Sequence, residues 1–182
     1  MNLHILPFAE EDAKIRLFFM DEAAFGRIND ISRCWAPSGV RPIVPYQMVR
    51  EYRQVYGAVD PISGDDFYII APGCNTMWTN AFFSEFSKEL GKDYALICLD
   101  NAGWHKSKAL EIPDNIRLFY IPKCTPEMNP IEQVWPVVRK EFKNKLYKTL
   151  DNLVDNLCNK LNSLNNELIK SITGREWVLS MF

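Results

Sequence analysis

Three acidic residues stand where a sheet protein can build a site. Asp21 follows the apolar run "IRLFFM", Asp100 follows the run "YALICL", and Glu132 comes after the run "IRLFYI", in the first turn of a predicted helix. The carboxyl ends of strands in an open α/β sheet surround a crevice. If the strands are neighbours, we expect the three carboxylates to converge on one point.

Convergent carboxylates repel one another unless a cation holds them together. Hard oxygen ligands select Mg²⁺ or Mn²⁺ over softer metals. Two such ions about 4 Å apart activate an attacking oxygen and stabilise a leaving one in phosphoryl transfer. The sequence contains no GxSxG, GxxxxGK[ST] or HExxH motif that would indicate a rival chemistry.

Each acid also has a purely structural interpretation. Asp100 and Asn101 precede Ala-Gly, which suits a turn or a helix N-cap. Asn129, Pro130 and Glu132 occupy the N-cap, N1 and N3 positions of a capping box. Taken singly, each acid is more readily structural, and the spacing alone indicates only a candidate metal site.

His105, five residues after Asp100, is one of only two histidines. It is predicted in or just before a short helix above Asp100, where it either orients a phosphate or a metal-bound water or is a half-buried helix residue. The half-buried interpretation is the preferred one on the residues alone.

The elements that position these residues are predicted from hydrophobic patterning. Residues 15–20, 94–99 and 116–121 are nearly continuous apolar runs, typical of buried strands. The intervening runs 33–37, 51–59 and 66–72 alternate, and residues 60–66 have the composition of a hairpin turn. We expect an antiparallel meander followed by strands that alternate with helices.

Three helical segments are predicted. Residues 76–91 show helical spacing with Gly91 as a stop. Ile131, Trp135, Val138 and Phe142 share one face of a second helix. From Thr149 an apolar stripe comprises Leu150, Leu153, Val154, Leu157, Leu161 and Leu164. We interpret this stripe as core packing, with a dimer seam as the alternative, and residues 1–182 as one mixed α/β domain.

The charge pattern is informative although the net charge is only −2. A free-standing DNA-affinity module is normally basic overall. All basic residues between 15 and 87 are arginines, which suit phosphate oxygens, and lysines gather between 140 and 148. A solvated surface is the more common reason for such clusters.

The cysteines and the hydropathy limit the other classes. Five scattered cysteines without a CxxC motif, and two histidines, argue against a zinc cage or a disulfide framework. No apolar run is long enough to cross a membrane, and "MNLHILPFAEEDAK" lacks a signal-peptide layout. We therefore expect reduced thiols, a cytoplasmic location and no membrane partner.

The phrases around the acids resemble a known family. "DEAAFGRINDISRCWAPSGVRP", "LDNAGWHKSKAL" and "PEMNPIEQVWPVVRKEF" resemble the DDE catalytic (endonuclease) domain of bacterial insertion-sequence transposases of the mariner superfamily, in order over residues 15–146. The resemblance implies a ribonuclease H-like fold, with a mixed sheet (antiparallel meander, then parallel strands) flanked by helices. It places the Asp-Asp-Glu triad on Asp21, Asp100 and Glu132.

The resemblance also implies a reaction and its partners. Two Mg²⁺ (or Mn²⁺) ions would bind the triad, water would cut DNA at the transposon ends, and the freed 3′-hydroxyl would attack target DNA. Asn101 and His105 would lie near the metals, and Asn129 would hold the turn that delivers Glu132. The enzyme would associate with the bacterial nucleoid when bound to DNA. The candidate DNA contacts are Arg27, Arg33, Arg41, Lys106, Arg139, Lys140 and Lys143.

Two departures from the family pattern stand out. No N-terminal helix-turn-helix domain fits into the residues before the first strand, which suggests a split-frame product, a degenerate element or a shortened chain. Pro136 follows Glu132 closely; it either kinks the helix that carries Glu132 or lies in the first turn of a helix that begins near Gln133.

Several alternatives remain open at this point. One is a DNA-binding or assembly subunit that no longer cuts, or a degenerate transposase remnant. Another is a nuclease of the same fold that acts on RNA–DNA hybrids. A separate DNA-recognition polypeptide and a homodimer on DNA are further expected partners.

Overall fold

The structure is a computed structural model that describes residues 12–28 and 31–180. His4 and most of the segment in which no signal peptide or recognition helix is expected lie outside the described residues. In the described part of the chain, no helix is long and apolar enough to cross a membrane. All five cysteines are described, and each is free.

A five-stranded mixed sheet forms the centre of the molecule, with the strand order β3-β2-β1-β4-β5. β1 pairs antiparallel with β2, and β2 pairs antiparallel with β3, whereas β4 and β5 continue the sheet parallel to β1. This arrangement confirms the predicted meander followed by parallel strands. The strands are β1 (Ile15–Ile28), β2 (Met48–Val59), β3 (Asp66–Ala71), β4 (Tyr94–Leu99) and β5 (Ile116–Tyr120).

β1 is longer than the apolar run predicted, and Asp21 lies inside it rather than at its end. The parallel pairing with β4 stops at Phe19 and Cys98. The antiparallel pairing with β2 continues through Gly26, so the strand outlasts its apolar run. Asp21 therefore lies just beyond the last residue that β1 pairs with β4.

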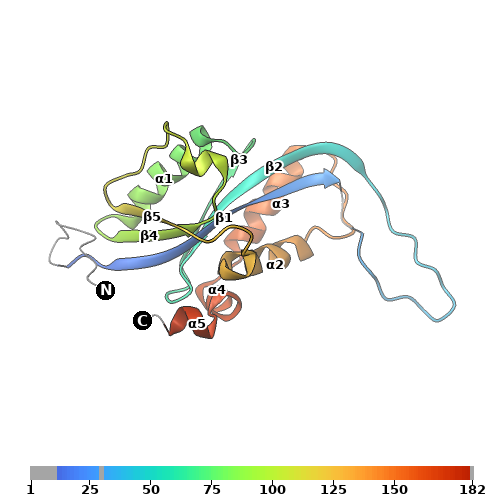
Figure 1. The fold of residues 1–182 in the computed structure, drawn as a ribbon. Coiled ribbons are helices and arrows are strands. Elements are labelled where there is room, and N and C mark those ends of the chain that lie inside the picture. The colour runs from blue at the N-terminus through green and yellow to red at the C-terminus, as the bar shows by residue number, and fades with distance from the viewer. Residues whose placement is uncertain (1–11, 29–30, 181–182) are drawn as a thin grey trace.

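The segment 31–47 contradicts the prediction of a strand at residues 33–37. It contains no strand, and Trp35 and Ile43 are almost fully exposed. Pro37, Pro42 and Pro45 lack the backbone N–H that strand pairing requires. Figure 1 shows this segment as a long loop that extends away from the sheet.

Helices cover both faces of the sheet (Figure 1). Because successive strand residues point to opposite faces, Phe18 and Met20 pack with α1, whereas Leu17 and Phe19 pack with the helices of the C-terminal half. The α-helices are α1 (Thr76–Leu90), α2 (Val134–Lys140), α3 (Leu150–Asn162), α4 (Asn166–Thr173) and α5 (Glu176–Leu179).

The local predictions for turns and helices are largely confirmed. Gly91 caps α1 with a φ of 59°, and Asp60 Oδ1 accepts the backbone N–H groups of Ile62 and Ser63 in the β2–β3 turn. The core interpretation of the apolar stripe is confirmed, because its four buried members all belong to the core on the side of β1 that bears Phe19. These are Leu153, Leu157, Leu161 and Leu164.

Candidate active site

The three acids line one cavity of about 460 Å³ at the carboxyl end of β4 and β5. Asp21 comes from β1, Asp100 from the residue after β4, and Glu132 from η3 (Pro130–Gln133), a 3₁₀ turn. We call this the acidic cavity. Its lining is Asp21, Asp100, Asn101, Ala102, Ile121, Pro122, Lys123, Cys124, Thr125, Pro126, Asn129 and Glu132.

The strand register explains why Asp21 and Asp100 approach each other. Phe19 is paired with Cys98 in the parallel ladder. Two residues further along each strand, the same register leads to Asp21 and Asp100. Both carboxylates therefore lie at the same end of the two strands, where they line the acidic cavity.

Asp21 is held by an indole. Trp135 Nε1 in α2 donates a hydrogen bond of 2.8 Å to Asp21 Oδ2. Burial raises the pKa of Asp21 to about 7, the negative charge of Glu132 adds to this increase, and the Trp135 hydrogen bond opposes it. Metal-free Asp21 thus lies in a setting that disfavours its charged form, and a cation would relieve this.

Gly57 provides the space that Trp135 needs. Gly57 is the partner of Asp21 in the β1–β2 ladder. A Cβ on Gly57 would approach the Trp135 ring to 2.8 Å and the Tyr68 ring to 2.9 Å. The absence of a side chain on β2 therefore lets the indole lie over the strand and reach Asp21.

Asp100 both forms a turn and lines the acidic cavity. Its Oδ1 accepts the backbone N–H of Ala102 at 2.9 Å, which is the turn contact expected from the sequence. The side chain remains 60% exposed and lines the acidic cavity. A turn-forming aspartate and a cavity-lining aspartate are the same residue here.

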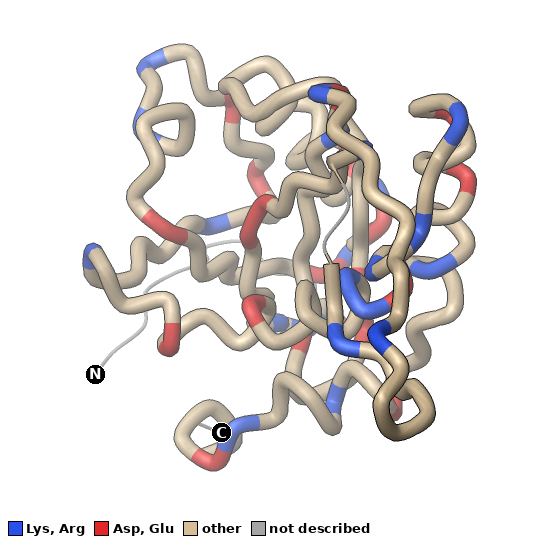
Figure 2. The backbone as a smooth tube through the Cα atoms, turned by 90° about the vertical axis from the view of Figure 1, so that its right-hand side faces the viewer, with Lys and Arg blue, Asp and Glu red and all other residues tan. Residues whose placement is uncertain are grey.

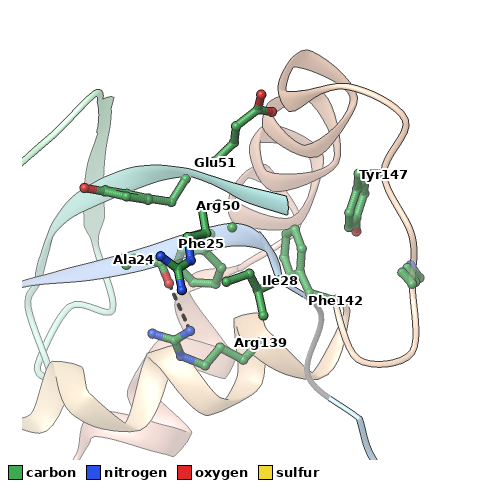
Figure 3. A pocket seen from close by; sticks show the side chains of 11 residues that line it. Ala24, Phe25, Ile28, Arg50, Glu51, Arg139, Phe142 and Tyr147 are labelled. Carbon is green, nitrogen blue, oxygen red and sulfur yellow. Dashed lines mark hydrogen bonds between the residues drawn. The ribbon is translucent and has the colours of Figure 1, made fainter. Parts of the chain in front are cut away.

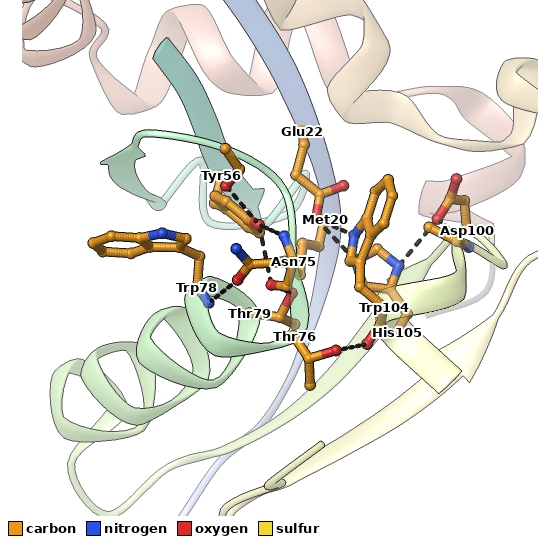
Figure 4. Close-up of polar contacts among 12 residues, drawn as sticks. Met20, Glu22, Tyr56, Asn75, Thr76, Trp78, Thr79, Asp100, Trp104 and His105 are labelled. Atoms are coloured by element: carbon orange, nitrogen blue, oxygen red, sulfur yellow. Dashed lines mark hydrogen bonds and ion pairs between the residues drawn. The ribbon is translucent and has the colours of Figure 1, made fainter. Parts of the chain in front are cut away.

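His105 is fully buried rather than half-buried, and it lies between two carboxylates (Figure 4). Nδ1 lies 3.0 Å from Asp100 Oδ1, and Nε2 lies 2.8 Å from Glu22 Oε1. Burial lowers the pKa of His105, but the hydrogen bond and charge of Glu22, together with Asp100, outweigh it, and the net pKa is raised.

Glu132 is delivered by η3, and α2 begins only at Val134. Pro136 is therefore in the first turn of α2, where its missing N–H removes no helical hydrogen bond. Of the two predicted alternatives, the late start is confirmed. Burial raises the pKa of Glu132, the charge of Arg139 lowers it, and the charge of Asp100 raises it.

The predicted capping box around Asn129 is wrong. The Asn129 side chain makes no capping bond; its Nδ2 instead donates to the Met20 carbonyl at 2.9 Å. The following turn is a 3₁₀ turn closed by the backbone bond from Glu132 N to Asn129 O. Asn129 thus fastens η3 to β1, one residue before Asp21.

Asn101, which lines the acidic cavity beside Asp100, is held by Ile121 and Lys106. Asn101 Nδ2 donates to the Ile121 carbonyl, and Lys106 Nζ donates to Asn101 Oδ1. Lys106 also lies over the Tyr120 ring, 4.8 Å from its centroid. These contacts join the loop after β4 to the end of β5.

The donor set of the acidic cavity fits a hard divalent cation. In the described part of the chain, no three His, Cys, Asp or Glu side chains are arranged to enclose a metal ion. Mg²⁺ does not need such a cage, because it keeps several waters and binds one or two carboxylates together with substrate phosphates. Three carboxylates around one open cavity meet that requirement.

The candidate DNA contacts differ in their exposure. Arg33, Arg41, Lys106, Lys140 and Lys143 are exposed. Arg27 is largely buried and binds Glu51 and the carbonyls of Tyr147 and Lys148, so it holds the chain together. Figure 2 shows Lys and Arg residues intermingled with Asp and Glu residues on the side of the molecule that lies at the right in Figure 1.

Arg139 lies at a second cavity of about 450 Å³ beside the far end of β1 (Figure 3). Its guanidinium donates to the Ala24 carbonyl at 2.9 Å and lies over the Phe25 ring. Arg50 and Lys145, which were not among the candidate DNA contacts, line the same cavity.

Sequence reasoning missed three residues of the site. Glu22 could have been found from the strand alternation. It points to the face of β1 opposite Asp21, where Phe18 and Met20 are buried, and a carboxylate on a buried face needs a partner. Lys123 lies in the loop that follows β5 and lines the acidic cavity. The contact of Trp135 with Asp21 has no signal in the sequence, because Trp135 is also a regular member of an apolar helix face.

Comparisons with known proteins identify the family and the fold of the chain. A family model described as DDE superfamily endonuclease matches residues 16–154. An uncharacterised protein of Sinorhizobium fredii (strain NBRC 101917 / NGR234), y4pE/y4sA, is 35% identical over 127 residues, which are 68% of this chain and 94% of that protein.

Solved structures show the same fold at low sequence identity. The Mos1 mariner paired end complex with Mn superposes with a TM-score of 0.70 at 12% identity, covering 87% of this chain and 52% of that chain. The Mos1 strand transfer complex gives 0.68 at 14% identity, covering 87% and 50%. A simian T-cell lymphotropic virus intasome gives 0.53 at 14% identity, covering 84% and 50%. The chain spans about half the length of these solved chains, and its fold is ribonuclease H-like.

Proposed function

Because the chain belongs to the DDE superfamily of endonucleases, we propose that it is the catalytic domain of a metal-dependent DNA transposase. It cuts DNA hydrolytically at transposon ends and transfers the freed 3′-hydroxyl to target DNA. The observation that carries this proposal is the acidic cavity, which is lined by carboxylates from β1, the end of β4 and η3.

In this proposal Asp21, Asp100 and Glu132 hold two Mg²⁺ or Mn²⁺ ions. When bound, the ions supply activation of the attacking oxygen and charge stabilisation of the leaving oxygen. Asp21 is rigid because it lies within a paired strand, and Asn129 fixes η3 and thereby Glu132. Lys123 at the cavity rim suits a phosphate oxygen of the bound strand.

DNA is the proposed partner, both as transposon ends and as target. The Mos1 structures, a paired end complex and a strand transfer complex, support this choice. We propose that the chain acts as a homodimer on DNA. The exposed cations Arg33, Arg41, Lys140 and Lys143 would then contact phosphates.

A nicking assay tests the cleavage step. Purified protein is incubated with supercoiled plasmid in Mn²⁺ or Mg²⁺, and relaxed product is measured. We expect wild type to nick, and Asp21→Asn, Asp100→Asn and Glu132→Gln each to lose at least about 100-fold in rate. Asp114→Asn, an exposed acid before β5 and thus at the opposite end of the strand, is the matched control.

Two outcomes would contradict the proposal. DNA binding without nicking in either metal would favour a non-cleaving assembly subunit or a degenerate remnant. Cleavage of an RNA–DNA hybrid that equals or exceeds cleavage of duplex DNA would favour a nuclease acting on another nucleic acid.

The strand-transfer step is tested separately, by measuring the joining of a pre-cut 3′ end to plasmid DNA.

A further inference from the structure

A buried histidine next to the acidic cavity contacts a carboxylate through each ring nitrogen (Figure 4). His105 lies 2.8 Å from Glu22 Oε1 and 3.0 Å from Asp100 Oδ1. The His105 side chain is 0% exposed and that of Glu22 is 7% exposed, whereas that of Asp100 is 60% exposed. The ring therefore connects the exposed, cavity-lining carboxylate to a buried one.

These contacts leave one oxygen of Asp100 available. The backbone N–H of Ala102 and Nδ1 of His105 both contact Oδ1 of Asp100. Among the described residues, no hydrogen-bond donor contacts Oδ2. An exposed aspartate samples several staggered rotamers, and two contacts on the same oxygen select one of them. Oδ2 is thus the oxygen left for a ligand.

The segment that carries His105 is itself fastened from three directions. His105 lies in η1 (Gly103–Lys106), whose carbonyls accept hydrogen bonds from Tyr120 Oη in β5, at 2.6 Å, and from Thr76 Oγ1 in α1, at 3.4 Å. Trp104 Nε1 donates to Glu22 Oε1 at 3.2 Å. A ring fixed by β1, β5 and α1 is a rigid support for an exposed side chain.

We propose that Glu22 and His105 are positioning residues that orient Asp100 so that its free oxygen can bind the catalytic metal. This inference rests on the proposed function. Glu22 fixes the ring through Nε2, and the ring fixes Asp100 through Nδ1. Asp21 and Glu22 thus serve the same site from opposite faces of β1, one by lining the cavity and the other through His105.

A matched pair of variants tests whether Nδ1 of His105 is the atom that holds Asp100. In His105→Asn the amide nitrogen takes the place of Nδ1, and in His105→Gln it takes the place of Nε2. Calorimetric titration with Mn²⁺ alone measures the dissociation constant. We expect His105→Gln to weaken binding about 10-fold or more, and His105→Asn to stay within about threefold of wild type, as for other supports of metal ligands.

Glu22 provides an independent rescue. Glu22→Ala removes the acceptor that fixes Nε2, whereas Glu22→Gln keeps an acceptor oxygen on a side chain of the same length. We expect Mn²⁺ affinity to fall in Glu22→Ala and to recover in Glu22→Gln. Thr173→Val, which removes a buried hydroxyl hydrogen bond within α4, is the control for a general loss of stability.

The outcomes separate this inference from the proposed function. Wild-type affinity in a folded His105→Gln, or equal losses in both His105 variants, would overturn the positioning role. The metal site itself would still stand if Asp100→Asn abolished binding. No Mn²⁺ binding by wild type, with or without duplex DNA, would overturn the proposed site and this inference with it. Thermal unfolding of every variant establishes that the protein titrated is folded.

Discussion

Asp66, the first residue of β3, has a buried oxygen that does not contribute to the acidic cavity. Its Oδ2 has no hydrogen-bond partner among the described residues. Burial raises the pKa of Asp66, so the folded protein holds this proton more tightly than the unfolded chain. The stabilisation is complete below the unfolded pKa of about 3.9 and is lost as pH rises through the folded pKa.

Asp66→Asn removes this ionisation. We expect the variant to unfold at a higher temperature than wild type at pH 8, and the advantage to shrink as pH falls toward 4. Thermal unfolding followed by circular dichroism from pH 4 to pH 8 measures the difference. A difference that is independent of pH would contradict the assignment to Asp66.

At the scale of elements, β2 and α2 meet over Asp21 through Gly57 and Trp135. Gly57→Ala would place a Cβ 2.8 Å from the indole, closer than packed atoms allow. We expect a loss of about 1–3 kcal/mol in the free energy of unfolding, as for other overpacked sites. Urea denaturation followed by tryptophan fluorescence measures it.

The matched control for this prediction is Gly73→Ala. A Cβ at Gly73 meets no atom within 4 Å, and its backbone does not have a positive φ. Equal stability of the two variants would show that β2 tolerates a side chain beneath the indole.

The start of α2 gives a second prediction at this scale. Because α2 begins at Val134, Pro136 breaks no helical hydrogen bond and restricts the unfolded chain. We expect Pro136→Ala to lower the free energy of unfolding by less than about 1 kcal/mol. An increase of about 3 kcal/mol, the cost of a proline in a helix interior, would mean that Pro136 strains the helix. Urea denaturation distinguishes these results.

The elements were predictable where burial repeats with a regular period. The apolar runs of β4 and β5 and the stripe Leu153, Leu157 and Leu161 in α3 carry that signal. The full length of β1 was not predictable, because its second half is held by pairing with β2 rather than by a continuous apolar run. The turn that carries Glu132 was not predictable either, because a capping box and a 3₁₀ turn use the same residue types.

The candidate site was predictable only in part. That Asp21, Asp100 and Glu132 lie around one cavity could be predicted from the strand ends and from the family resemblance. The contacts of Asp21 with Trp135, and of Glu22 with His105, join residues more than 80 positions apart in the sequence. Such contacts depend on how the elements pack, and one sequence without its fold does not determine them.

At the scale of the whole molecule, a net charge of −2 predicts weak and salt-dependent DNA binding. We expect Lys143→Gln to reduce the slope of the logarithm of affinity against the logarithm of salt concentration by about one, because Lys143 is exposed.

Arg27→Gln should leave this slope unchanged and lower the stability of the protein, because Arg27 binds Glu51 and two carbonyls. Fluorescence anisotropy with duplex DNA between 50 and about 200 mM salt tests both. An effect of Arg27→Gln on the slope would contradict its structural role.

The central claim is that Asp21, Asp100 and Glu132 form one metal site, and crystallography with Mn²⁺ tests it most directly. Crystals grown with Mn²⁺ would be measured at a wavelength where manganese scatters anomalously. We predict anomalous peaks in the acidic cavity, about 2.1 Å from carboxylate oxygens of the triad, as for hard cations. The Asp100 oxygen bound would be Oδ2, with Oδ1 still on His105. Manganese bound elsewhere, with the triad oxygens contacting only protein donors, would contradict the account.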